Sequence, residues 1–128
     1  MIRIEEVEHT ADLRLRLCVD DESEIYKGVV EAIRFATEVE VAAEVESTAV
    51  LNLKGDIEDQ IFDMANELIY HLSKGLFPVE LSKEGELLKI SLGRVVKDPH
   101  LEVKALTYHD LMLRKTDDGF CTYLVFDI

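Results

Sequence analysis

The chain has 128 residues, which is enough for one domain with a single sizeable core. Hydrophobic residues make up 48% of it, so we expect a folded globular protein rather than a disordered one. Because 27 acidic residues outnumber 14 basic ones, the formal net charge is −13 at pH 7. A surface this acidic repels phosphate backbones, which argues against direct, non-specific binding of RNA.

No apolar run is long enough to span a bilayer, and residues 1–6 show no signal-peptide pattern. We therefore expect a cytoplasmic protein with no membrane partner. The two cysteines, Cys18 and Cys121, lack the spacing of a metal site. Because both fall in strand-like runs, we expect buried or half-buried free thiols rather than a disulfide. A cysteine nucleophile would need a base from far along the chain, such as His9 or His109, which disfavours that chemistry.

The first part of the chain carries strand and helix patterns. Residues 3–7 and 13–19 have apolar side chains at every second position, which predicts half-buried strands. Residues 20–23 supply helix-capping side chains, and apolar residues at helical spacing then predict a helix over 25–36. Residues 45–53 alternate again and predict a third strand.

The clearest helix pattern begins after Asp56, a residue type that caps helix N-termini. Six apolar residues form one stripe along it, namely Ile57, Ile61, Ala65, Leu68, Ile69 and Leu72. Gly75 suits the position just past the C-terminus of the helix, and Pro78 prevents its continuation. This helix should therefore be amphipathic and pack one face on the core.

The remainder of the chain is strand-like. Residues 86–96 and 103–114 predict two strands, and the hairpin signal at 117–119 leads into a final strand over 120–127. The element order is β-β-α-β-α-β-β-β. It predicts an α+β class, with residues 1–128 as one sandwich domain of two amphipathic helices packed on a mostly antiparallel sheet.

The final strand ends in two adjacent carboxylates, the side chain of Asp127 and the main-chain terminus on Ile128. Asp12 supplies a third carboxylate near the start of the chain. Adjacent carboxylates need a cation, a proton or a donor to offset their repulsion. Because Mg²⁺ and Ca²⁺ take oxygen ligands, a cation site suits these residues, and a hydrogen-bonded carboxylate cluster suits them equally well.

The basic and polar segment around Lys104 and His109 is the other candidate. Strict alternation would place these two side chains on opposite faces of a strand. His109 precedes Asp110, which could indicate acid–base chemistry, but strand geometry favours a core histidine held by a carboxylate. Lys104 is either a solvated strand lysine or a contact for a phosphate or a partner protein.

The hairpin also predicts a register for the final strand. Residues 103–113 and 120–127 should pair antiparallel across the short turn. Counting outward from that turn places Asp127 opposite Leu111 or Asp110. The terminal carboxylates would then lie beside His109 rather than at the Lys104 end.

These segments, taken in order, resemble the archease family. The matching stretches are His9-Thr10-Ala11-Asp12, the run from Lys104 to Leu111 and Phe126-Asp127-Ile128, with residues 56–59 and 66–68 resembling the family's long helix. The resemblance spans residues 9–128. It implies an accessory protein, not an enzyme, that activates the RtcB-type, GTP-dependent tRNA-splicing ligase by promoting its guanylylation and multiple turnover.

The resemblance also implies roles for single residues. Asp12, Asp127 and Ile128 fall on the family's metal-binding positions, for a divalent cation that is calcium, or magnesium or manganese in the cell. Lys104 matches the family's functional lysine, and His9 and His109 are further candidates for partner contacts. RNA would be reached only through the ligase, and a homo-oligomer is compatible with the pattern.

Arg14 departs from the family, where smaller residues are common, and it could partly neutralise the carboxylate site.

Two other functions stay open. One is a chaperone-like modulator of a tRNA-modifying enzyme such as a methyltransferase, which the same resemblance allows. The other is a metal-dependent hydrolase that uses a carboxylate-bound water. The glycines are scattered and form no nucleotide-binding loop, so we do not expect this chain to hold GTP itself.

Overall fold

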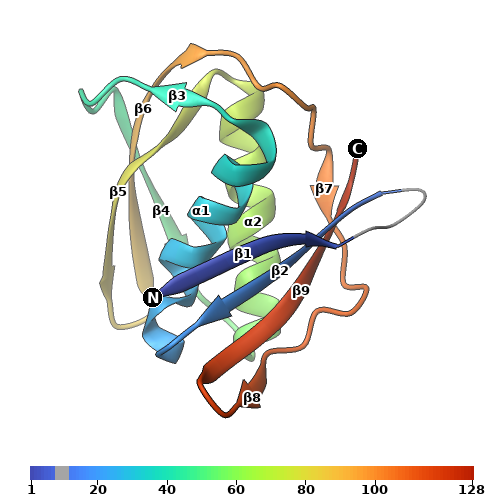
Figure 1. Cartoon of the computed structure of the whole chain (residues 1–128). Helices are drawn as coiled ribbons and strands as arrows, with labels where there is room; N and C mark the ends of the chain where they lie inside the picture. The colour runs from blue at the N-terminus through green and yellow to red at the C-terminus, as the bar shows by residue number, and fades with distance from the viewer. Residues whose placement is uncertain (8–11) are drawn as a thin grey trace.

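The structure is a computed structural model, and it describes residues 1–7 and 12–128 (Figure 1). The strands are β1 (Ile2–Val7), β2 (Leu13–Val19), β3 (Glu40–Val41), β4 (Ser47–Asn52), β5 (Leu76–Glu84), β6 (Leu87–Lys97), β7 (Ala105–Leu106), β8 (Arg114–Thr116) and β9 (Gly119–Asp127). The helices are a 3₁₀ turn, η1 (Glu22–Glu24), then α1 (Ile25–Thr37) and α2 (Ile57–Ser73). No helix in the described part of the chain is long and apolar enough to cross a membrane.

The strands form two antiparallel sheets. The first has the order β1-β2-β9-β7, with β8 also pairing with β9, and the second has the order β3-β6-β4, with β5 also pairing with β6. The predicted α+β class is therefore confirmed, although the sequence pattern indicated one sheet rather than two. The sequence analysis missed β5 and the short β3. In β5 the pairing with β6 shifts register between Pro78 and Glu80, and proline is tolerated at such an irregularity because it has no N–H to donate.

The two helices pack between the sheets (Figure 1). On one side α1 lies against β2, and α2 contacts β5 of one sheet and β7 of the other. Gly28 allows the close approach of α1, because a Cβ there would lie 3.1 Å from Leu17 Cδ1. The buried core takes residues from β2, both helices, β6 and β9, including Leu15, Leu17, Ile33, Ile61, Met64, Leu68, Ile90 and Phe126.

Helix boundaries follow the predicted capping chemistry. Asp21 is the N-cap of the first helical turn and forms a reciprocal capping box with Glu24. Asp56 caps α2 by accepting a hydrogen bond from the Asp59 N–H at 2.9 Å. Gly75 follows the last turn of α2 with φ +81°, a left-handed conformation that glycine adopts without steric cost.

The predicted long strand over 103–114 is wrong. Only β7 and β8 form there, and residues 107–113 leave the sheet as a loop. Helix α2 holds this loop, because Tyr108 donates to Asp59 Oδ1 at 2.9 Å and its ring stacks on Phe62 at 4.0 Å between centroids. The main-chain N–H of Leu113 also donates to Glu58 Oε2 at 2.9 Å. These contacts come from another element, so period-two alternation could not reveal them.

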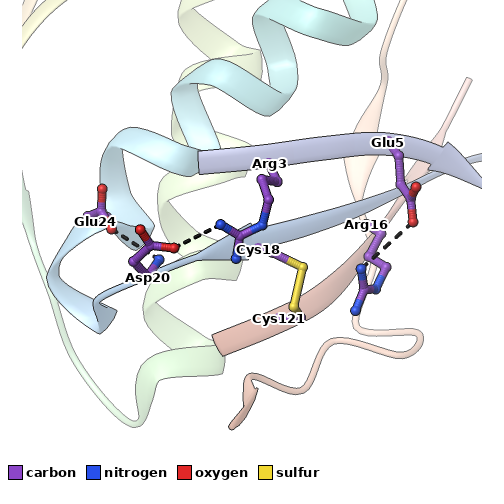
Figure 2. The surroundings of a disulfide bond; sticks show 7 residues. All are labelled: Arg3, Glu5, Arg16, Cys18, Asp20, Glu24 and Cys121. Atoms are coloured by element: carbon purple, nitrogen blue, oxygen red, sulfur yellow. Dashed lines mark hydrogen bonds and ion pairs between the residues drawn. A yellow bond between two sulfur atoms is a disulfide. The ribbon is translucent and has the colours of Figure 1, made fainter. Parts of the chain in front are cut away.

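The expectation of free thiols is also wrong. Cys18 on β2 and Cys121 on β9 form a disulfide (Figure 2). The register of the two strands places these residues directly opposite one another, with Cα atoms 4.1 Å apart. They are 103 residues apart in sequence, so only the strand pairing brings them together.

Candidate functional site

One end of the β2–β9 pair carries the predicted carboxylates. Leu13 pairs with Phe126 in this antiparallel pair. Asp12, which precedes Leu13, and Asp127, which follows Phe126, therefore lie at the same end of the two strands. The Oδ1 atom of Asp12 is buried, whereas Asp127 and Ile128 are exposed. A partly buried carboxylate therefore lies at the same strand end as two open ones.

Lys104 joins this end of the sheet, which corrects the predicted register. Asp127 pairs with Ala105, not with Leu111 or Asp110. The main-chain N–H of Lys104 donates to the carbonyl oxygen of Asp127 at 2.8 Å. The prediction failed because residues 107–113 form a loop rather than a strand, so that Ala105, an earlier residue, lies opposite Asp127. The exposed Lys104 side chain therefore starts beside the carboxylates.

Asn66 on α2 sets the position of β7. Its side-chain oxygen accepts from the Leu106 N–H at 2.9 Å, and its side-chain nitrogen donates to the Leu106 carbonyl at 3.3 Å. Both main-chain groups of one β7 residue are thus satisfied by one amide. In the sequence, Asn66 stood out only as part of the stretch over 66–68 that resembles the family's long helix, and its contact with β7 was not predicted. The available signal was an amide at helical spacing between Phe62 and Ile69, on the side of α2 that faces other elements.

His109 does not occupy the core, contrary to the expectation for a strand histidine. It lies in the loop, its side chain is 64% exposed, and its Nε2 is 3.4 Å from Asp110 Oδ2. The same carboxylate oxygen lies 2.6 Å from Nη1 of Arg14. Arg14 also stacks over the Tyr123 ring, 4.2 Å from the centroid. Arg14 and His109 therefore both contact the carboxylate of Asp110, in the loop over residues 107–113.

His9 lies outside the described residues, as do Thr10 and Ala11. Within residues 1–7 and 12–128, no cluster of three or more His, Cys, Asp or Glu side chains is arranged to hold a metal ion. The donors at the end of β9 are two aspartates and a main-chain carboxylate. All are oxygens, so they fit a hard cation such as Ca²⁺ or Mg²⁺ in kind and leave coordination positions for water or a partner. Their metal role stays a prediction.

Comparison with known proteins assigns the chain to a family. The model of the Archease protein family matches residues 4–128. The chain belongs to the archease family. It is 32% identical to the protein archease of Thermotoga maritima, over 94% of this chain and 96% of that protein. It is 34% identical to the protein archease of Pyrococcus abyssi, over 93% of each.

Solved structures show the archease fold as well. A crystal structure from Thermotoga maritima, described as an archease and possible chaperone, superposes with a TM-score of 0.81 at 29% identity, covering 97% of this chain and 96% of that one. The solution structure of protein 1598 from Methanobacterium thermoautotrophicum gives a TM-score of 0.67 at 18% identity, covering 98% of each chain. The second likeness concerns the fold alone.

Proposed function

We propose that this archease is an accessory protein, not an enzyme, that activates an RtcB-type, GTP-dependent RNA ligase by promoting guanylylation and multiple turnover. The supporting observation is that Lys104 and the carboxylates of Asp127 and Ile128 share one end of β9 in a chain of this family. A cation and a lysine in one place can act together on one phosphate or acidic group.

The residues at this end of β9 would have different roles. Asp12, Asp127 and the Ile128 carboxylate would hold a divalent cation, which supplies positive charge that the partner's active site can use. The exposed Lys104 side chain would contact a phosphate or an acidic group of the partner complex. The Asn66 amide keeps β7, and hence the main chain of Lys104, against the end of β9.

The charge of the chain supports indirect contact with RNA. With 27 acidic and 14 basic residues, the protein repels a free phosphate backbone. The ligase would therefore bind the RNA, and this archease would bind the ligase.

The test is multiple-turnover ligation of RNA by the cognate ligase, with and without this protein, together with a guanylylation assay. Lys104→Ala should abolish most of the stimulation. Lys89→Ala is the matched control, because Lys89 is an exposed strand lysine on β6 of the other sheet. Equal ligation rates with and without the wild-type protein would remove the proposal.

One observation favours a second function. The Thermotoga maritima relative is described as a possible chaperone. A chaperone-like role here would show as a change in the aggregation or product pattern of a tRNA-modifying enzyme, such as a methyltransferase. It would be preferred if this archease changed that pattern and left RNA ligation unaffected.

A further inference from the structure

Arginines gather on the outer face of the first sheet. Arg3, Arg14, Arg16 and Arg114 are four of the six arginines of the chain. Arg14 and Arg16 alternate along β2 with leucines that face the core, so they point outward. Arg3 pairs with Cys18, and Arg114 pairs with Cys121, which places both on the face that carries the disulfide. Figure 2 shows Arg3 and Arg16 flanking that disulfide.

A cavity of about 490 Å³ opens on this face. It is lined by residues of β2, β9 and β8 and of the loop that precedes β8. We call it the arginine cleft. Its lining residues include Arg14, Arg16, Arg114, Asp110, Tyr108 and Met112.

The arginine cleft is positive in an acidic protein. Three lining arginines face one lining carboxylate, that of Asp110, which is bound to Arg14 at 2.6 Å. Arg16 has only a loose contact with Glu5 at 3.8 Å, and the two side chains are 40% and 65% exposed. Arg114 is exposed on β8. At least two guanidinium groups are thus available to an incoming anion, although the chain as a whole carries −13.

The composition of the arginine cleft is that of a protein interface. Two of its lining residues, Met112 and Tyr108, are 51% and 52% exposed. Arginine, tyrosine and methionine are enriched at the centres of protein interfaces. A guanidinium group also binds a carboxylate in a planar, bidentate manner. We propose that the arginine cleft docks an extended acidic segment of a partner protein.

The spacing of the cations favours an extended segment. Arg14 and Arg16 are two residues apart on one strand, so their Cα atoms lie about 7 Å apart. Side chains on one face of an extended peptide repeat at about the same distance. Arg114 lies two strands away from β2, about 10 Å across the sheet. Acidic residues at alternate positions, running along β2, therefore match the first two arginines while a further acidic group reaches the third.

The size of the arginine cleft disfavours RNA as the occupant. Electrostatic attraction is screened over about 8 Å at physiological ionic strength, so the arginines act mainly on charges inside the cleft. A short segment with two or three carboxylates fits within that range. An RNA strand would extend past it onto the acidic remainder of the surface, where its phosphates are repelled.

The test is an NMR titration of the isotope-labelled protein with a short synthetic peptide of alternating aspartate and serine residues. The controls are the same peptide with asparagine in place of aspartate, and a single-stranded RNA of similar charge. We expect the acidic peptide alone to shift the amide signals of β2, β8 and β9. Shifts elsewhere, no shifts, or tighter binding of the RNA would overturn the proposal.

Matched variants complete the experiment. Arg16→Glu combined with Arg114→Glu should weaken binding of the acidic peptide by about tenfold or more, because two attractive contacts become repulsive. Arg94→Glu combined with Lys89→Glu makes the same change of charge on β6 of the other sheet and should leave the affinity unchanged. Equal losses in the two double variants would show that net charge, not the arginine cleft, governs binding. Because no ligase is present, the outcome is independent of the proposed function.

Discussion

The main-chain N–H of Lys104 donates to the carbonyl oxygen of Asp127 at 2.8 Å, which fixes the base of a cationic side chain beside the carboxylates that end β9. This hydrogen bond is made by the backbone, so it does not depend on the lysine side chain. The side chain is exposed and can therefore be changed without disturbing the strand pair. That separation makes Lys104 a clean probe of function.

Lys104→Ala should impair stimulation of the RNA ligase and leave the fold intact. We expect a change in the free energy of unfolding within about 0.5 kcal/mol, because the side chain is exposed and its removal opens no cavity. The measurements are urea unfolding of the variant and its effect on ligation turnover. If the folded variant stimulates the ligase as well as the wild type, the Lys104 side chain is a solvated surface group without a role in activation.

Asn66→Leu should destabilise the protein by about 1–3 kcal/mol, because it leaves the N–H and carbonyl of Leu106 without the amide that now satisfies both. It should also lower ligase stimulation at temperatures where the variant is folded, since β7 carries Lys104 to its place. Asn66→Asp keeps the acceptor for the Leu106 N–H but turns a carboxylate oxygen toward the Leu106 carbonyl, so it should also destabilise the protein. A fully active, equally stable Asn66→Leu protein would contradict this role.

The hydrogen bond between Tyr108 and Asp59 should appear in a pH titration. This bond, more than desolvation and the charge of Asp59, raises the pKa of Tyr108 above its ordinary value of 10.0. A group whose pKa is raised on folding stabilises the protein below its unfolded pKa, and this contribution is lost as the pH rises through the folded pKa.

Asp59→Asn should move the Tyr108 titration to lower pH, because the charged acceptor is lost. The ultraviolet absorbance of tyrosinate reports the titration, and subtracting the curve of Tyr108→Phe isolates this residue. An unchanged curve for Asp59→Asn would show that the hydrogen bond does not govern the pKa of Tyr108.

Local signals in the sequence were enough for the helices and several strands. Asp56 and Gly75 mark the two ends of α2 through capping chemistry that involves only near neighbours. Alternating leucines likewise define β2, because one face of that strand is buried and the other is not. Features of this kind need no knowledge of the rest of the fold.

Features decided by distant contacts were missed. The loop over residues 107–113 leaves the sheet because Phe62 and Asp59 on α2 hold Tyr108. As a result Asp127 pairs with Ala105 and not with the residue that strand counting predicts. Strand β5 was not predicted because it contains Pro78, which local sequence rules count against a strand. The register shift that accommodates this proline arises only in the pairing with β6. The carboxylates at the end of β9 could be recognised from the residues themselves, and the family resemblance added their metal role. Only the structure placed Lys104 beside them.

The disulfide should contribute strongly to stability. Cys18 and Cys121 are 103 residues apart, and in the chain-entropy account a bond that closes a loop of about 100 residues stabilises by about 4.7 kcal/mol. Because measured values are commonly lower, we expect Cys18→Ala combined with Cys121→Ala to cost about 2–5 kcal/mol in urea unfolding. Reductant should shift the wild-type midpoint and leave the double variant unchanged. A wild-type midpoint that is insensitive to reductant, with both thiols then titratable, would contradict the prediction.

The carboxylate of Ile128 should contribute to cation affinity as a charge, separately from the packing of its side chain. We expect amidation of the Ile128 carboxylate to weaken binding of Ca²⁺ or Mg²⁺, because one of three anionic donors is neutralised while every side chain remains. Ile128→Ala is the matched control, since it keeps the carboxylate and removes a side chain that is 45% exposed and lies beyond β9. Calorimetric titration of the two folded proteins separates the effects. If the amidated protein binds the cation as tightly as the wild type, the terminal carboxylate is not a ligand. If Ile128→Ala loses as much affinity as amidation, packing at the chain end, not charge, holds the site together.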